Sequence, residues 1–334
     1  MSLRTLKVLG AALLILLAAS SWAHAKDLSA RPFTDLYIFG DSLSDSGNLF
    51  AATQGLPFPP GPQPPSPPYF QGRFSDGPVW VESLALLLDL EVDFDTNVLI
   101  DPLAKNQAFG GAFTGEGSLS GLPVGLQSQV NNFAMAGGEI GRDDLVIVWA
   151  GANNYFDGGT DTAGAVNDLA RAIWRLSDLG GRRFLVPNLP DLGDTPLGPA
   201  SDNVAALNAL SASHNGLLEK TIRKFRLFSR LEVALFDVNA PFRQLLTDAA
   251  VFGFDQAKVG GSCLVQMPDG TRPPSGLCPP LGETFDSTGV VFWDLVHPTG
   301  VVHRQIAIIA HTTLVALQNR ALRLPFLAAQ LEEE

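Results

Sequence analysis

Three side chains near the two ends of the chain have the types and spacing that nucleophilic catalysis needs. Ser42 directly follows an apolar run, in the stretch FGDSLSDSGN. Asp294 and His297 stand three residues apart in FWDLVHPTG, where the carboxylate can reach the imidazole N–H. A serine hydroxyl is a weak nucleophile and needs both a base and a group that orients the base. The pattern predicts a serine nucleophile, a histidine base and an orienting aspartate.

These residues also have a structural interpretation. Ser42 could cap a following helix, as could Ser44, Asp45 and Ser46. We expect that helix to begin within SLSDSGN, so that its first amides point at whatever lies above Ser42. An isolated Asp-x-x-His is more often a surface pair than part of a triad. The short stretch around Ser42 therefore does not decide its role by itself.

His297 is expected on a loop rather than within a helix. Pro298 favours an extended conformation at the residue before it. Thr299 is expected to cap the helix that begins near residue 301. The imidazole would then be displayed at the start of that helix.

Two further groups of residues could donate hydrogen bonds to an oxyanion. NQAFGGAF places Gly110 and Gly111 after a short apolar run, where main-chain amides can approach a ligand closely. VWAGANNYF places Asn153 and Asn154 just past another apolar run, and an asparagine amide can donate to an oxyanion there. Glycine and asparagine are also common turn residues, so neither group is decisive alone.

The blocks FGDSLSDSGN, NQAFGGA, GANN and DLVHP, in this order, resemble the GDSL or SGNH family of serine esterases and lipases. The resemblance implies Ser42 as the nucleophile, His297 as the base and Asp294 as the residue that orients it. It also implies three oxyanion donors, which are the N–H of Ser42, the N–H of Gly111 and the side chain of Asn153.

The chain departs from the family pattern at one position. Gly-x-Asn-Asp in the family reads Gly151-Ala152-Asn153-Asn154 here, which leaves open which of the two asparagines donates. The stretches GRFSDGPVWVESLA and LPDLGDTP resemble the larger, secreted bacterial-type lipase and acylhydrolase branch. The resemblance thus covers about residues 35–315.

Short apolar runs indicate the elements that must position these residues. Buried parallel strands are predicted at residues 36–40, 145–151, 183–188 and 232–238. Helical patterns lie at residues 79–90, 163–179, 203–228 and 301–322. This alternation predicts an α/β fold whose ligands bind beyond the carboxyl ends of the strands. The resemblance implies a three-layer α/β/α sandwich with a flavodoxin-like parallel sheet.

The stretch 55–70, GLPFPPGPQPPSPPYF, holds eight prolines and no charged residue, so it cannot be a regular helix or a central strand. It has two interpretations. One is a rigid exposed loop, and the other is a loop that lines one side of a substrate cleft.

The first 25 residues have the features of a cleavable signal peptide. Arg4 and Lys7 precede a short apolar run that ends in Ala23-His24-Ala25. We therefore expect residues 26–334 to form a single domain of a secreted or periplasmic protein.

Cys263 and Cys278 are the two cysteines of the chain, and an even count in an exported protein favours a disulfide over two free thiols. The formal net charge of −12 argues against nucleic acid as a partner, because such binding depends on clustered Lys and Arg. The histidines show no metal-ligand spacing. We expect neither a metal nor a cofactor.

The leading hypothesis is a carboxylic-ester hydrolase that works through an acyl-enzyme on small-molecule or lipid esters. A monomer with transient contact to a lipid surface is expected. One alternative is a carbohydrate O-acetyl esterase, with the sugar stacked on Tyr69, Phe70, Tyr155 or Phe156. A second alternative, from a different class, is a catalytically inactive exported binding protein that kept the fold.

Overall fold

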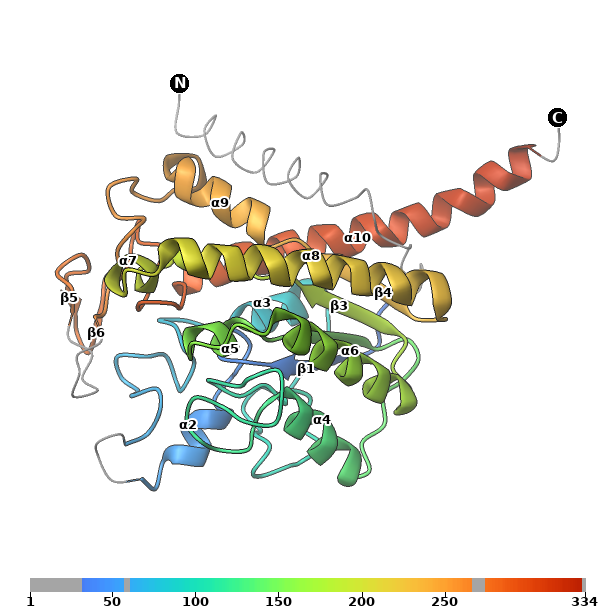
Figure 1. Cartoon of the computed structure of the whole chain (residues 1–334), viewed down its shortest axis with the longest axis horizontal. Helices are drawn as coiled ribbons and strands as arrows, with labels where there is room; N and C mark the ends of the chain where they lie inside the picture. The colour runs from blue at the N-terminus through green and yellow to red at the C-terminus, as the bar shows by residue number, and fades with distance from the viewer. Residues whose placement is uncertain (1–31, 57–60, 266–273, 332–334) are drawn as a thin grey trace.

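A computed structural model describes residues 32–56, 61–265 and 274–331, which are built around a parallel sheet (Figure 1). The predicted signal peptide, residues 1–25, lies outside the described residues. Four strands lie side by side in chain order: β1 (Leu36–Gly40), β2 (Leu145–Trp149), β3 (Arg183–Pro187) and β4 (Glu232–Phe236). Every residue of the first three is buried, as continuous apolar strands require. The four predicted strands and the α/β fold class are confirmed.

A further segment, residues 105–109, runs along the outer edge of β1. The main-chain N–H groups of Gln107 and Phe109 donate to the carbonyl oxygens of Ile38 and Gly40, at 2.8 and 3.1 Å. The pairing is parallel. If this segment is counted as a strand, the sheet has the flavodoxin-like order 2-1-3-4-5. The segment 105–109 thereby brings Gly110 and Gly111, which follow it, to the carboxyl end of β1.

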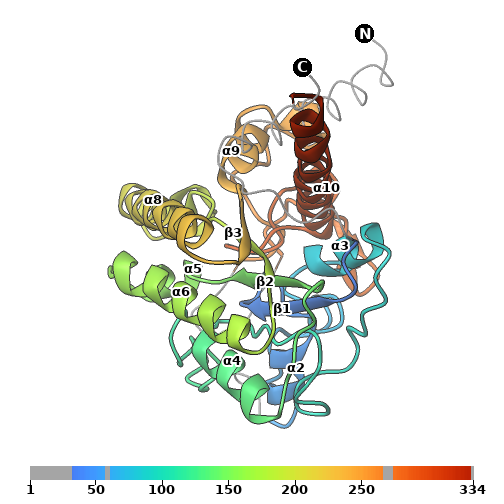
Figure 2. The same cartoon turned by 90° about the vertical axis from the view of Figure 1, so that its right-hand side faces the viewer.

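Helices cover both faces of the sheet, so the sheet is the middle one of three layers (Figure 2). One face carries α3 (Trp80–Leu87) and α10 (Gly300–Leu331), and the other carries α4 (Leu126–Met135), α6 (Thr162–Asp178) and α8 (Val204–Phe228). Alternate residues of β1 enter opposite cores, Leu36 and Ile38 on the first face and Tyr37 and Phe39 on the second. The three-layer α/β/α sandwich is therefore present.

The four predicted helices correspond to α3, α6, α8 and α10. The helix expected within SLSDSGN corresponds to α2 (Asn48–Thr53). The sequence pattern did not indicate the remaining elements, which are α4 above, α5 (Ala152–Phe156), α7 (Leu197–Ala200), α9 (Asn239–Thr247), the short 3-10 helices η2 (Leu192–Asp194) and η3 (Ala249–Phe252), and the paired strands β5 (Pro280–Leu281) and β6 (Thr284–Phe285). The stretch Gly300–Gln318 of α10 is long and apolar enough to cross a membrane, but 44% of it is buried inside the protein. We therefore treat it as a core helix.

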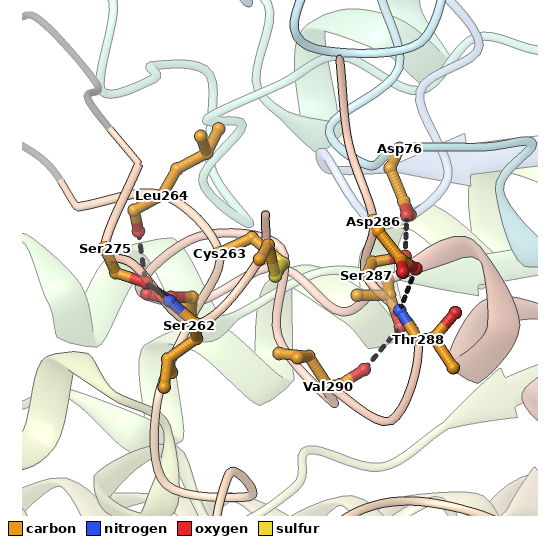
Figure 3. The surroundings of a disulfide bond; sticks show 12 residues. Asp76, Ser262, Cys263, Leu264, Ser275, Asp286, Ser287, Thr288 and Val290 are labelled. Carbon is orange, nitrogen blue, oxygen red and sulfur yellow. Dashed lines mark hydrogen bonds between the residues drawn. A yellow bond between two sulfur atoms is a disulfide. The ribbon is translucent and has the colours of Figure 1, made fainter. Parts of the chain in front are cut away.

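The predicted disulfide between Cys263 and Cys278 is confirmed, with 5.1 Å between the Cα atoms (Figure 3). Both cysteines are buried in a cluster that includes Trp293. The N–H of Leu264 donates to the carbonyl oxygen of Trp293 at 2.8 Å. The disulfide and the adjoining Leu264 thus pack against the segment that leads to Asp294.

Candidate active site

Ser42 lies two residues past the end of β1, at the carboxyl edge of the sheet. The chain turns there, because the N–H groups of Ser44 and Asp45 donate to the carbonyl oxygen of Asp41 at 3.0 and 3.1 Å. Ser42 is only 6% exposed, and it lines a cavity. The strand and the turn together hold the serine at the edge where parallel sheets bind ligands.

A helix does begin within SLSDSGN, as predicted, but at the last residue of that stretch and not next to the serine. The helix α2 begins at Asn48, and the carboxylate of Asp45 accepts the N–H groups of Asn48 and Leu49 at 2.6 and 3.1 Å. Asp45 therefore caps this helix, as expected. The hydroxyls of Ser44 and Ser46 instead accept hydrogen bonds from side chains elsewhere in the fold. The first main-chain N–H groups of α2 donate to Asp45 and do not point at the serine.

Ser42, His297 and Asp294 form a continuous hydrogen-bonded chain. Ser42 Oγ lies 2.7 Å from His297 Nε2. His297 Nδ1 lies 2.9 and 2.8 Å from the two carboxylate oxygens of Asp294. Because an ionised carboxylate only accepts hydrogen bonds, Nδ1 carries the imidazole proton and Nε2 is left to accept the serine proton. This arrangement matches what serine attack on a carbonyl requires.

Main-chain hydrogen bonds fix the loop that carries Asp294 and His297. Asp294 Oδ1 accepts the N–H groups of Val296 and His297 at 3.0 and 2.8 Å. The N–H of Trp293 donates to the carbonyl oxygen of His297 at 2.8 Å. The three-residue spacing therefore closes a tight turn that brings the carboxylate back onto the imidazole.

The start of α10 is held by residues that the sequence did not single out. Thr299 directly precedes α10, but its hydroxyl donates to the carbonyl oxygen of Val290 at 3.1 Å, and among the described residues no first-turn N–H of α10 donates to that hydroxyl, which corrects the prediction. The N–H of Gly300 instead donates to Asp76 Oδ1 at 2.6 Å, and Ser75 Oγ donates to the carbonyl oxygen of Pro298 at 3.0 Å. The FSDG stretch, noted only as part of the family resemblance, thus supports the histidine loop.

Gly111 lines the same cavity as Ser42 and is placed there by its backbone conformation. Its φ is 74°, and an added Cβ would lie 3.2 Å from Leu119 Cβ, so the position favours glycine. The N–H of the preceding Gly110 donates to Asp45 Oδ2 at 2.7 Å. Because that amide already has an acceptor, Gly111 is the better candidate of the two for an oxyanion donor.

The two asparagines after β2 have different surroundings. Asn153 lines the cavity, and its Nδ2 donates one N–H to the carbonyl oxygen of Ala112 at 3.1 Å. The second N–H of that amide remains for another acceptor. Asn154 instead accepts the N–H of Thr114 at 3.0 Å and donates to Thr114 Oγ1 at 3.2 Å. The geometry favours Asn153 as the oxyanion donor.

The cavity beside Ser42 has a volume of about 650 Å³ and mostly apolar walls. Its apolar lining residues are Leu49, Ala52, Leu56, Phe74, Leu119, Leu122, Phe156, Leu197, Leu295 and Val296. Gln63 of the proline-rich stretch also lines it, which supports the cleft-lining interpretation of that stretch. In the described part of the chain, no three His, Cys, Asp or Glu side chains are grouped to hold a metal ion.

Burial shifts the pKa of several groups around the site. It raises the pKa of Asp41 to about 7, and it also raises the pKa of Asp45, where four main-chain N–H groups partly offset it. Burial lowers the pKa of His303 to about 3 and that of His214 to about 4. His303 is therefore neutral at physiological pH, and its Nδ1 accepts the N–H of Trp80 at 3.2 Å.

Comparison with known proteins gives consistent matches over most of the chain. The profile of a family described as GDSL-like lipase/acylhydrolase matches residues 36–309. The phosphatidylcholine-sterol acyltransferase of Aeromonas hydrophila is 32% identical over 320 residues, covering 83% of this chain and 89% of that protein. The secreted effector protein SseJ of Salmonella typhimurium is 28% identical, covering 85% of this chain and 64% of that protein. The thermolabile hemolysin of Vibrio parahaemolyticus is 28% identical, covering 86% and 65%.

Proposed function

Because this chain belongs to the GDSL-like lipase/acylhydrolase family, we propose that it is an exported serine hydrolase acting on acyl or lipid esters. Ser42 is the nucleophile, His297 the general base, and Asp294 the residue that orients the base. One observation carries the proposal: the hydrogen-bonded chain of these three side chains opens onto an apolar cavity.

The first half-reaction forms an acyl-enzyme. Ser42 Oγ attacks the ester carbonyl carbon while His297 Nε2 takes the hydroxyl proton. The negative charge that develops on the carbonyl oxygen is received by the N–H of Ser42, the N–H of Gly111 and the side-chain amide of Asn153. The bond from the carbonyl carbon to the alcohol oxygen then breaks, and His297 returns its proton to the departing alcohol.

The second half-reaction releases the acid. A water molecule gives a proton to His297 Nε2 while its oxygen adds to the acyl carbon. The bond to Ser42 Oγ then breaks, and the serine oxygen takes the proton from His297. Asp294 stays ionised throughout and stabilises the imidazolium. Since a protonated imidazole cannot act as a base, activity should fall at acid pH.

The cavity supports an acyl chain rather than a sugar as the bound group. Its walls are mainly aliphatic and aromatic, as an acyl chain requires. Of the aromatic residues considered for stacking on a sugar, Tyr69 and Tyr155 are each only 2% exposed. Leu56 and Leu119 line the cavity while about half exposed, at 46% and 49%, which supports transient contact of this rim with a lipid surface.

An alcohol in place of water would turn the same acyl-enzyme into an acyl donor. The relative from Aeromonas hydrophila is named as a sterol acyltransferase. Acyl transfer is therefore the second candidate, and analysis of the products with an added sterol or a simple alcohol separates it from hydrolysis. A new ester would support transfer, and free acid alone would support hydrolysis.

Hydrolysis of p-nitrophenyl esters from C2 to C16 by wild-type, Ser42→Ala and Ser46→Ala protein tests the proposal. Ser42→Ala should lower kcat by at least about 10³-fold with the fold retained, because the nucleophile is lost. Ser46→Ala, a buried serine of the same segment, should keep most activity. Near-full activity of folded Ser42→Ala would end the assignment. A strict preference for C2 would favour the carbohydrate O-acetyl esterase, and an inactive wild type would favour the binding protein.

A further inference from the structure

Tyr69, at the end of the proline-rich stretch 55–70, contacts Asp294. The residue is 2% exposed, and its hydroxyl donates to Asp294 Oδ2 at 2.5 Å, across 225 positions of sequence. A phenol that donates to a carboxylate makes a short, charge-assisted hydrogen bond. Tyr69 therefore contacts the residue that orients His297, although it does not line the cavity beside Ser42.

The two oxygens of Asp294 both lie close to His297 Nδ1, but they differ in their other partners. Oδ1 accepts the N–H groups of Val296 and His297, which fix the turn. Oδ2 accepts the hydroxyl of Tyr69 at 2.5 Å and also lies 2.8 Å from His297 Nδ1. The phenol thus shares Oδ2 with the imidazole, which also lies 2.9 Å from Oδ1. Any change in the hydrogen bond from Tyr69 alters how much negative charge Oδ2 presents to the imidazole.

The ring of Tyr69 is held rigidly in this position. It packs edge-on against Trp293, the residue before Asp294, with 6.2 Å between ring centroids and an interplanar angle of 89°. On another side it packs against Phe74 at 6.2 Å, and the Phe74 ring lies 4.8 Å from the imidazole of His297. These contacts mean that the hydroxyl is already ordered before substrate arrives, so its bond costs little additional side-chain entropy.

The loop around Tyr69 is tied to the histidine loop as well. Ser66 Oγ donates to the carbonyl oxygen of Tyr69 at 2.6 Å, and the N–H of Phe70 donates to the carbonyl oxygen of Ser75 at 2.9 Å. Ser75 in turn donates to the carbonyl oxygen of Pro298, next to the base. The segment that carries the phenol and the segment that carries the imidazole are therefore positioned as one unit.

We propose that Tyr69 is a positioning residue for ester hydrolysis, whose hydroxyl fixes Asp294 and limits the charge that Asp294 presents to His297. The inference rests on the proposed function. With the phenol bonded to Oδ2, the imidazolium is stabilised less strongly, so the imidazole stays in its neutral, basic form to lower pH. Without the hydroxyl, Asp294 is both less fixed and more strongly coupled to the imidazolium.

Tyr69→Phe keeps the ring and removes only the hydroxyl, which makes it the test variant. We expect kcat to fall roughly five- to thirty-fold with little change in KM, since a hydrogen bond to a charged group is lost away from the substrate. We also expect the acid limb of the pH profile of kcat/KM to move to higher pH. The other titratable groups coupled to His297, Asp41 after β1 and His303 in α10, are unchanged in this variant.

Tyr37→Phe is the matched control. Tyr37 is also buried, and its hydroxyl donates to the carbonyl oxygen of Glu139 at 3.2 Å and lies 2.7 Å from Lys105 Nζ, remote from the triad. This variant reports the cost of losing a buried hydroxyl on thermal unfolding. It should leave both kcat and the acid limb as in wild type.

A second variant carries 3-fluorotyrosine at position 69 and makes the same hydroxyl a stronger donor. The acid limb of its kcat/KM profile should lie at the same pH as in wild type or at a lower pH, whereas in Tyr69→Phe it moves to higher pH. Wild-type kcat in Tyr69→Phe, or an acid limb in Tyr69→Phe that is unmoved or shifted to lower pH, overturns the inference. If a fluorophosphonate does not label Ser42 in wild-type protein, the proposed function itself is overturned. Failure of the inference about Tyr69 and failure of the proposed function are therefore distinguishable.

Discussion

Replacement of Asn153 by alanine is expected to lower kcat of ester hydrolysis by about 10²–10³-fold, with little change in KM. The Asn153 amide donates one N–H to the carbonyl oxygen of Ala112 at 3.1 Å, and its second N–H remains for the oxyanion. The oxyanion exists only around the tetrahedral state, so this bond stabilises the transition state rather than the bound ester. The loss corresponds to about 3–4 kcal/mol of activation free energy.

Asn154→Ala is the matched control, because it removes the same amide from the next residue. Asn154 makes two hydrogen bonds with Thr114, at 3.0 and 3.2 Å, and these tie α5 to the loop after the glycine pair. A neutral hydrogen bond contributes about 1 kcal/mol net. The variant should therefore lose about 2 kcal/mol of unfolding free energy and keep most of its kcat.

Steady-state kinetics on one p-nitrophenyl ester, together with thermal or denaturant unfolding, separates the two effects. Asn153→Ala should lose rate at nearly unchanged stability, and Asn154→Ala should lose stability at nearly unchanged rate. The reasoning is refuted if the two outcomes are exchanged. A loss below about ten-fold in folded Asn153→Ala would also refute it, because one oxyanion donor is worth more than that.

Two other predictions concern the cavity and the buried histidines. Ala52→Phe narrows the apolar cavity and should shift the p-nitrophenyl ester preference towards shorter chains; an unchanged chain-length profile would mean that the acyl chain lies elsewhere. The pKa of His214 is lowered to about 4, so between pH 6.5 and 4 the unfolded chain binds a proton that the folded chain does not, and stability falls as pH falls, by roughly 3 kcal/mol. His214→Gln should remove this part of the slope of unfolding free energy against pH, and a slope equal to that of wild type would contradict the assignment.

The strands of the sheet could be predicted because a buried parallel strand is a local signal in the sequence. The run at residues 36–40 coincides with β1, and the other three predicted strands differ from the structure by one or two residues at one end. The segment 105–109 was not predicted as a strand. Its run is short and half polar, and its pairing with β1 depends on contacts that exist only in the folded chain.

The hydrogen-bonded arrangement of Ser42, His297 and Asp294 could be predicted from short motifs, although Ser42 and His297 are 255 positions apart. The choice between Asn153 and Asn154 could not, because it depends on which amide Thr114 occupies. The sequence suggests Tyr69 only as one of four aromatic residues that could stack on a sugar in the carbohydrate O-acetyl esterase alternative. Nothing local to its sequence indicates that its hydroxyl meets a carboxylate 225 positions away.

Covalent labelling with a fluorophosphonate tests the central claim most directly. The folded protein is treated with the probe, and the modified peptide is identified by mass spectrometry, with Ser42→Ala as the control. A nucleophile activated by His297 should give a single adduct on Ser42, which is absent from the variant. Folded wild-type protein without an adduct on Ser42, or with its adduct on another serine, would contradict the account.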